Sequence, residues 1–390
     1  MKKLIILLSC VICACSLNAK KIFNVPESCY QQVKDLGDPK LENEKSSSVI
    51  LLGDTQCYTH FSPNTGILNI MLNWIAFQRE ALNISAVFGV GDIVQVANLP
   101  EILGKFSTAE LVKGSVKDGL YRQRSCYNRN STQQWQAISD AFKVLDNKVA
   151  YFITTGNHDH GKVWGDGRQT RFNEFFTPER NMKNLESLML TGKDENNKNC
   201  LQNAIYKLDV GNVWGEVYVL SMELKPRQEV LNWAKKTIES KKYKGKRFII
   251  LTHAFINQHG VLSNDDNYKM KGVSAYKWWD SFVKNTPEIK AIFCGHHCDN
   301  NNSFEQSTCF KTFKNESGGN VHAMMFNPQT IGGGFSGNGG DGWLRILEFM
   351  PDGETIKVKT YSPFFGISPM TKHFAWRVAD FDMFEFKLDK

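Results

Sequence analysis

Short apolar runs that end in glycine and a polar residue recur along this chain, and they constrain its fold more than any other feature. The runs are rich in β-branched and aromatic residues and are short, which predicts buried strands. Each strand would deliver a carboxylate or an amide at its carboxyl end. The first three runs and their polar ends are 48–52 before Gly53-Asp54, 86–90 before Gly91-Asp92, and 151–154 before Thr155-Gly156-Asn157.

Apolar residues at helical spacing lie between these strands. Residues 66–82 and 135–145 each place their large apolar side chains on one helical face. The order strand–helix–strand–helix–strand favours right-handed crossovers and a largely parallel sheet. Further strands are expected at 204–209, 213–222, 247–251, 289–293, 322–326, 343–349 and 355–361, with helices near 226–233 and 276–283.

Two of the later strands also end in polar side chains, because residues 247–251 precede Thr252-His253 and residues 289–293 lead to Gly295-His296. Open α/β sheets place their sites at the carboxyl ends of strands. Any one of these residues would ordinarily be a turn or cap residue, but the complete set in order favours a metal site. The set consists of Asp54, Gln56, Asp92, Asn157, His158, Asp159, His253 and His296.

This set of ligands suits two divalent metal ions. Carboxylate, amide and imidazole groups bind Mn²⁺, Fe²⁺ or Zn²⁺. Two ions about 3.5–4 Å apart require a bridging carboxylate and ligands on both sides, which this set can supply. The sequence therefore predicts a dinuclear centre suited to phosphoryl chemistry, with metal identity left open among Mn, Fe and Zn.

The amino terminus has the layout of a secretory signal peptide. Lys2-Lys3 precede an apolar run from Leu4 to Cys15, and Ala19 is a suitable cleavage residue. We expect residues 1–19 to be removed and the protein to be secreted and extracellular, or periplasmic in a bacterium. A lipoprotein signal ending at Cys10 is a minor alternative, and we expect no membrane anchor.

Composition narrows the partners. The net charge of +7 mildly suits an anionic substrate, although we favour its interpretation as a solvated, lysine-rich surface. No basic block is dense enough to predict nucleic-acid binding, so we expect a small phosphorylated substrate. In a eukaryotic secretory pathway, Asn-x-Ser/Thr triplets would accept glycans, which makes the protein a candidate glycoprotein, although several such triplets are expected by accident in so Asn-rich a chain. The four triplets begin at Asn83, Asn130, Asn301 and Asn315.

The remaining chain divides into three expected parts. Residues 20–47 form a polar leader, residues 48–366 form the domain that carries the site, and residues 367–390 form a C-terminal extension. Residues 99–132 read as a basic insertion within the domain. This insertion is either a solvated decoration, which we favour, or a cap over the cleft that meets anionic substrate.

The polar strand ends, taken in order, resemble the motifs of the calcineurin-like metallophosphoesterase superfamily. Those motifs are D-x-H, G-D, G-N-H-D/E, H and G-H-x-H, and the resemblance extends from about residue 48 to 366. Gly53-Asp54-Thr55-Gln56 looks like an exported branch in which Gln replaces the first histidine. The resemblance implies an α/β (α+β) fold, a four-layer α-β-β-α sandwich of two mixed sheets flanked by helices.

The resemblance also implies roles for the site residues. Asp54 and Gln56 would bind the first metal, Asp92 would bridge, and the second metal would be held by Asn157, His253 and His296. His158 would contact the phosphate and protonate the leaving oxygen, with Asp159 orienting its ring. The implied reaction is hydrolysis of phosphate mono- or diesters by metal-bound hydroxide.

The last motif departs from the family pattern, because Gly295-His296-His297-Cys298 has a cysteine where the family has its second histidine. The Cys298 thiolate would either bind the first metal or be held in a disulfide with Cys309. Cys298 and Gln56 together leave open an alternative function, that of a catalytically impaired binding protein on the same scaffold. His60 and His160, which lie near the motifs, are expected to be loop residues without metal.

Overall fold

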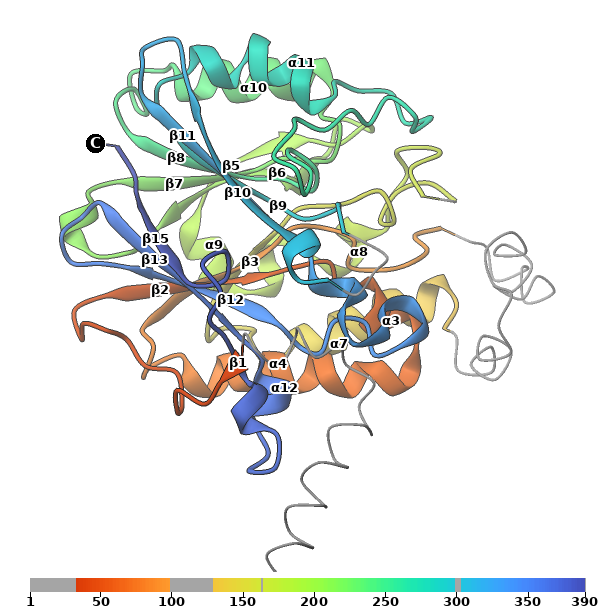
Figure 1. Cartoon of the computed structure of the whole chain (residues 1–390). Helices are drawn as coiled ribbons and strands as arrows, with labels where there is room; N and C mark the ends of the chain where they lie inside the picture. Colours follow the sequence, from red (N-terminus) through yellow and green to blue (C-terminus); the bar gives the residue numbers. More distant parts are fainter. Residues whose placement is uncertain (1–32, 99–128, 163, 299–302, 390) are drawn as a thin grey trace, which may run out of the picture.

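The computed structural model describes residues 33–98, 129–162, 164–298 and 303–389. Two β-sheets face each other, and helices cover the outer side of each (Figure 1). Both sheets contain parallel and antiparallel pairs. The four-layer sandwich of mixed sheets expected from the sequence is confirmed.

The first sheet is built around three parallel strands, β2, β3 and β4, with β12 antiparallel to β2. Its strand order is β1-β14-β13-β12-β2-β3-β4, and β15 pairs with β13. The strands are β1 (Val33–Lys34), β2 (Ser47–Leu52), β3 (Ile84–Gly89), β4 (Ala150–Ile153), β12 (Leu344–Phe349), β13 (Thr355–Tyr361), β14 (Trp376–Arg377) and β15 (Phe384–Lys387).

The second sheet has the order β10-β11-β9-β8-β7-β6-β5. Its four inner strands β7, β8, β9 and β11 run parallel, and the strands outside them pair antiparallel. The strands are β5 (Leu188–Lys193), β6 (Asn199–Leu208), β7 (Val217–Ser221), β8 (Arg247–Leu251), β9 (Ile289–Cys294), β10 (Thr308–Lys314) and β11 (Asn320–Phe326).

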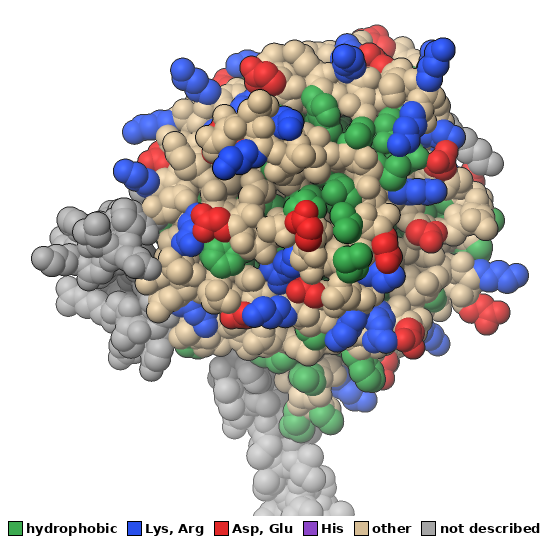
Figure 2. Space-filling model, turned by 180° about the vertical axis from the view of Figure 1, so that it is seen from behind, with side chains coloured by type: hydrophobic (Ala, Val, Ile, Leu, Met, Phe, Trp, Pro, Cys, Tyr) green, Lys and Arg blue, Asp and Glu red, His purple; other side chains and the backbone are tan. Residues whose placement is uncertain are grey.

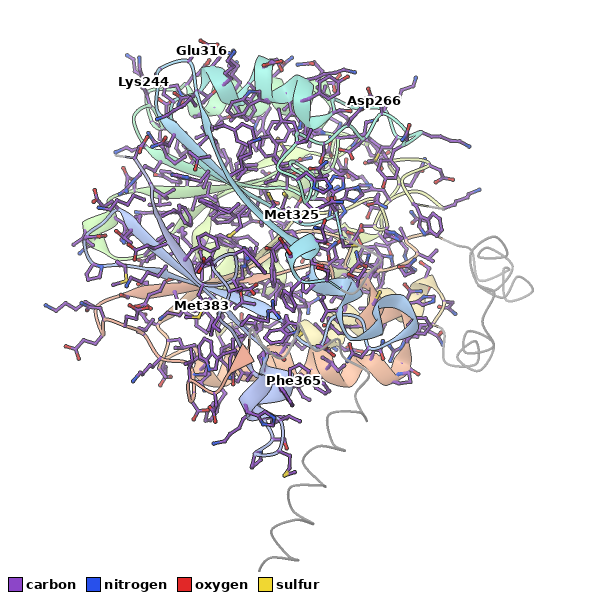
Figure 3. All side chains as sticks on the ribbon, viewed as in Figure 1. Lys244, Asp266, Glu316, Met325, Phe365 and Met383 are labelled. Carbon is purple, nitrogen blue, oxygen red and sulfur yellow. The ribbon has the colours of Figure 1, made fainter. Side chains whose placement is uncertain are left out.

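Alternate residues along the second sheet face two different cores, as the pleat of a strand requires. Tyr206 belongs to the core between the sheets, and its ring stacks on Phe152 of the first sheet with centroids 4.0 Å apart. Its neighbour Ile205 faces the outer core with Met325, which Figure 3 labels. The sheets are thus fixed face to face, and their strand ends are brought to a common edge.

Helices complete both outer layers. The helices α4 (Thr65–Gln78) and α7 (Ser131–Phe142) cover the first sheet, and α10 (Gln228–Ile238) and α11 (Ala275–Ser281) cover the second (Figure 1). A capping box formed by Asn130 and Gln133 sets the start of α7. Shorter helices are α3 (Gln56–His60), α8 (Phe172–Phe175), α9 (Met182–Ser187) and α12 (Pro363–Gly366). Single 3₁₀ turns are η1 (Ser62–Asn64), η4 (Pro178–Arg180), η5 (Asn212–Trp214), η6 (Val283–Asn285), η7 (Glu305–Ser307) and η9 (Lys372–Phe374), and η8 (Pro328–Ser336) is longer.

The fold continues past the expected domain boundary at residue 366. Strands β14 and β15 pair with β13, and β1, within the expected leader, pairs with β14. The expected signal peptide and most of the 99–132 insertion lie outside the described residues. Across the described ranges, the helices are too short or too polar to cross a membrane.

Candidate metal centre

Five strand ends from the two sheets meet at one edge of the sandwich. Asp54, Asp92 and Asn157 follow β2, β3 and β4, whereas His253 and His296 follow β8 and β9. The glycines beside them permit this approach: a Cβ atom on Gly156 would collide with the Asp92 carboxylate, and one on Gly295 with that of Asp54. The structure therefore brings together the residues that the strand-end pattern selected.

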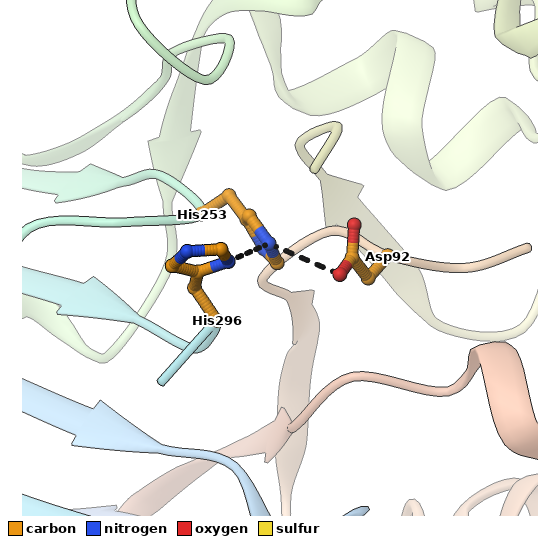
Figure 4. Close-up of side chains that lie close together, drawn as sticks. All are labelled: Asp92, His253 and His296. Atoms are coloured by element: carbon orange, nitrogen blue, oxygen red, sulfur yellow. Dashed lines mark hydrogen bonds and ion pairs between the residues drawn. The ribbon is translucent and has the colours of Figure 1, made fainter. Parts of the chain in front are cut away.

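His253 lies at the centre of this group (Figure 4). Its Nδ1 donates a hydrogen bond to the carbonyl oxygen of Val90 at 2.8 Å, which turns Nε2 toward the other side chains. Three atoms surround Nε2, namely His296 Nδ1 at 3.0 Å, Asn157 Oδ1 at 3.1 Å and Asp92 Oδ2 at 3.2 Å. Four groups that supply lone pairs thus converge on one point.

These separations fit a divalent cation. Two ligands that bind an ion at about 2.1 Å and at right angles to each other lie roughly 3 Å apart. Burial lowers the pKa of His253, but the carboxylates of Asp92 and Asp54 outweigh it and raise that pKa to about 10. A proton on His253 thus partly neutralises the negative charge of the two buried carboxylates. A divalent ion bound at the same point would carry twice the positive charge.

The other half of the centre, around Asp54, has competing hydrogen bonds. The Asp54 carboxylate accepts from the backbone N–H of His296 at 3.2 Å, and from the side-chain amides of Asn327 at 2.7 Å and Gln329 at 3.2 Å. Asn327 and Gln329 follow β11, the next parallel strand after β9, and sequence reasoning missed both. Their only signal was a polar pair after an apolar strand, with no glycine motif.

Gln56 contacts the carboxylate of Asp92. Its Nε2 donates to Asp92 Oδ2 at 3.4 Å, while its Oε1 is buried and has no hydrogen-bond partner among the described residues. A buried amide oxygen without a donor is costly unless a cation or water satisfies it. This oxygen therefore fits the expected role of Gln56 as a ligand of the first metal.

Cys298 faces a pocket of about 310 Å³ at the centre. Cys309 is a free thiol, so the alternative disulfide between the two cysteines is not formed. His297 is bonded through Nε2 to Ser263 Oγ at 2.6 Å and is not part of the pocket wall. The pocket is lined by Gln56, Asp92, Gln95, Asn157, His158, Tyr268, His296, Cys298, Gln329 and Thr330.

The expected contact between His158 and Asp159 is wrong. Asp159 accepts hydrogen bonds from the backbone N–H groups of Ile93, Val94 and Gly156 at 2.8–3.1 Å, so its carboxylate faces the loop after β3. The ring of His158 is oriented by the carbonyl oxygen of Gln95, 2.9 Å from Nδ1. The side chains of His158 and Asp159 point in different directions, so their adjacency in the sequence does not bring them into contact.

The sequence predicts loop positions for His60 and His160, but His60 is the last residue of helix α3, and only His160 lies in a loop. Both side chains are buried. His60 Nδ1 lies 3.1 Å from the amide of Gln134. His160 is bonded to Thr155 Oγ1 at 2.9 Å and to the carbonyl oxygen of Arg168 at 2.8 Å. His160 therefore fixes the loop that follows the Asn157 motif.

Comparison with known families assigns the part of the chain that carries these residues to a family. The model of the calcineurin-like phosphoesterase family matches residues 47–300, which include all five converging strand ends. The chain belongs to the calcineurin-like phosphoesterase family. Membership confirms the resemblance found in the motifs and supports the expected enzyme class, a hydrolase of phosphoric esters. The narrower exported branch is not tested by this match.

Individual relatives of this calcineurin-like phosphoesterase are distant. YvnB of Bacillus subtilis (strain 168), an uncharacterized protein, is 25% identical over 323 residues, which cover 81% of this chain and 20% of YvnB. Purple acid phosphatase PPD1 of yellow lupin aligns with a TM-score of 0.44 and 13% identity, over 88% of this chain and 54% of PPD1. GAP50 of Plasmodium, an anchor in the inner membrane complex, aligns with a TM-score of 0.40 and 12% identity, over 88% and 89% of the two chains. The chain thus spans about a fifth of its Bacillus relative and about half of the lupin enzyme.

Proposed function

We propose that this chain is an exported phosphoesterase that hydrolyses phosphate mono- or diesters at a pair of divalent metal ions. The observation that carries the proposal is the convergence of Asp92, Asn157 and His296 on Nε2 of His253, beside a pocket lined by His158. The family assignment supports the same reaction class.

The protein groups have separate tasks. Asp92, Asn157, His253 and His296 would hold one ion, and Asp54, Gln56 and Cys298 would complete a second position with Asp92. When bound, the ions supply a nucleophile at neutral pH and offset the charge of the phosphoryl oxygens. Mn, Fe and Zn all suit these ligands.

His158 serves as the proton donor in this proposal. Its Nδ1 is engaged with the carbonyl oxygen of Gln95, and because a carbonyl only accepts, Nδ1 carries the hydrogen. Nε2 is then the nitrogen that exchanges a proton with substrate. Water adds to phosphorus, the bond from phosphorus to the ester oxygen breaks, and that oxygen takes a proton from Nε2.

Charge and export complete the proposal. Lysine, arginine and acidic side chains are interspersed on the face seen in Figure 2, which suits a small phosphorylated substrate better than a nucleic acid.

Secretion follows from the amino-terminal pattern and is tested by sequencing the amino terminus of the mature protein, which should begin at Lys20. Recovery of uncleaved protein from the cell interior would contradict it.

Glycosylation at the four Asn-x-Ser/Thr triplets has less support than secretion. Asn315 is buried and its Oδ1 accepts from Ser317 and Gly319, while Asn130 caps α7 and Asn83 donates to Ser46. These three side chains hold turns and a helix start, so glycosylation would disturb the hydrogen bonds they make. Asn301 lies outside the described residues. Mass spectrometry of the secreted protein tests each position.

The reaction is tested by assaying a monoester and a diester in parallel, with bound metal counted on the same sample. Purified protein supplied with Mn²⁺ or Zn²⁺ should hydrolyse phenyl phosphate, bis(phenyl) phosphate or both, and should lose the activity with a chelator. An inactive protein that holds one ion or none would instead support the alternative, a binding protein on this scaffold. The three hydrogen bonds already made by Asp54 are the observation that favours this alternative.

A further inference from the structure

Beside the metal centre lies a tryptophan whose exposure and backbone are both unusual. Trp164 is 44% exposed, and its φ of 47° lies in the left-handed region. For a bulky side chain this conformation costs energy and is found where the surrounding structure enforces it, often at functional sites. The position of Trp164 is therefore not explained by its own packing.

The loop that carries Trp164 is fixed on two sides. The N–H of Gly165 donates to the carbonyl oxygen of His160 at 3.1 Å, and the carbonyl oxygen of Gly165 accepts from the N–H of Met270 at 2.9 Å. Gly165 also lies against Tyr268, since a Cβ atom there would be 3.2 Å from the ring. The backbone next to Trp164 is thus held between the loop after the Asn157 motif and the segment that bears Tyr268.

Both aromatic rings border groups of the centre. The Trp164 ring lies 5.5 Å from the ring of His158, measured between centroids, at an angle of 49°. Tyr268 lines the pocket, with its hydroxyl 3.5 Å from His296 Nε2. Since His158 faces the ester oxygen in the proposed reaction, Trp164 lies on the side of the leaving group.

We propose that Trp164 and Tyr268 form a leaving-group subsite that selects phosphate esters whose alcohol carries an aromatic or heteroaromatic ring. A planar ring stacks on an exposed indole and on a phenol in the pocket wall, whereas a short alkyl group gains little there. This inference rests on the proposed function for the identity of the substrate, but the binding preference it predicts is measurable without turnover.

Kinetics with phenyl phosphate and ethyl phosphate test the subsite. In Trp164→Ala the ratio of kcat/KM for phenyl over ethyl phosphate should fall by about tenfold, mainly through KM, because stacking holds the substrate and the transition state alike. Trp164→Phe should retain most of the preference. Phe77→Ala, which removes an aromatic side chain 81% exposed on α4, should leave the ratio unchanged.

Calorimetry with phenylphosphonate and methylphosphonate, which cannot be hydrolysed at an ester, separates the two proposals. Tighter binding of phenylphosphonate by the metal-loaded protein, lost in Trp164→Ala, supports the subsite even if no ester is hydrolysed, a result that would overturn only the proposed reaction. Equal effects of Trp164→Ala on both phosphonates, or no effect on either, overturn the subsite.

Discussion

The two halves of the metal centre share Asp92 but differ in what surrounds their ligands. Around His253, the lone pairs of Asp92, Asn157 and His296 converge within 3.0–3.2 Å. Around Asp54, by contrast, two side-chain amides and one backbone N–H already donate to the carboxylate. Asp92 accepts from fewer donors, namely the Gln56 side-chain amide at 3.4 Å and the backbone N–H of His158 at 2.8 Å. The two halves therefore differ in how many donors compete with a metal ion for the carboxylate.

The pKa values of the two carboxylates also differ, since that of Asp54 is raised and that of Asp92 is lowered. Burial raises the pKa of Asp54 well above its usual value, and the charge of Asp92 adds to this, although His253 opposes it. Burial also raises the pKa of Asp92, but the charges of His253 and His158 outweigh it, and the pKa is lowered. We therefore expect the His253 half to bind its ion more tightly than the Asp54 half.

The largest expected effect comes from removing the central ligand. His253→Ala should lower kcat/KM by about a thousandfold, because the ion at this position stabilises charge in the transition state. Bound metal, counted by mass spectrometry of elements, should fall by one ion per chain. His373→Ala, which removes an exposed histidine, is the control. Full turnover in His253→Ala would contradict the claim that the ion held by His253 is needed for the reaction.

His158→Ala tests proton donation separately from metal binding. We expect a loss in kcat of about a hundredfold with ethyl phosphate, as for removal of a general acid. The loss should be smaller with phenyl phosphate, since phenolate leaves without a proton more easily than ethoxide. Metal content should stay at the wild-type value. Equal losses on both esters would argue that His158 does not protonate the leaving group.

Cys298→Ala tests whether Cys298 binds the first ion, in the Asp54 half of the metal centre. If the thiolate of Cys298 binds the first ion, the dissociation constant of the weaker site should rise by about tenfold, while the tighter site stays the same. Titration of metal-free protein with Zn²⁺ in a calorimeter measures both constants. Cys200→Ala, which removes a buried thiol on β6, is a matched control. An unchanged weaker site would exclude Cys298 as a ligand.

The smallest expected effect comes from removing a side-chain amide that donates to Asp54 and so competes with the metal ion. Gln329→Ala removes one hydrogen bond to Asp54, worth about 1 kcal/mol, and should tighten the weaker site by about fivefold. Gln136→Ala on the exposed side of α7 provides the control. Weaker binding of the first ion in Gln329→Ala would show instead that Gln329 positions Asp54 for the metal.

The strand-end pattern was sufficient to predict the meeting of Asp54, Asp92, Asn157, His253 and His296, whereas the four-layer architecture was implied by the family resemblance. Glycine beside a polar residue is a local signal with a local cause, since Gly156 and Gly295 must leave room for the carboxylates. The partners Asn327 and Gln329 could not be predicted. Their contact with Asp54 depends on β11 pairing with β9, which is set by tertiary packing.

The misassigned role of Asp159 has a cause similar to that of the absence of β10 and β14 from the strands predicted by the sequence. Whether Asp159 faces His158 or the backbone after β3 depends on the turn conformation, which adjacent sequence letters do not encode. Strand β10 mixes polar and apolar residues at the edge of its sheet, so its burial pattern is weak. Strand β14 has only two residues and is defined by its partners β1 and β13.

The most direct test of the central claim is a crystal of the protein soaked with less than one equivalent of Mn²⁺ or Zn²⁺, with anomalous scattering recorded at the metal edge. The account predicts a single peak bounded by Asp92, Asn157, His253 and His296, and a second peak near Asp54, Gln56 and Cys298 only with excess metal. A first peak beside Asp54, or no peak at His253 at saturating metal, would contradict it.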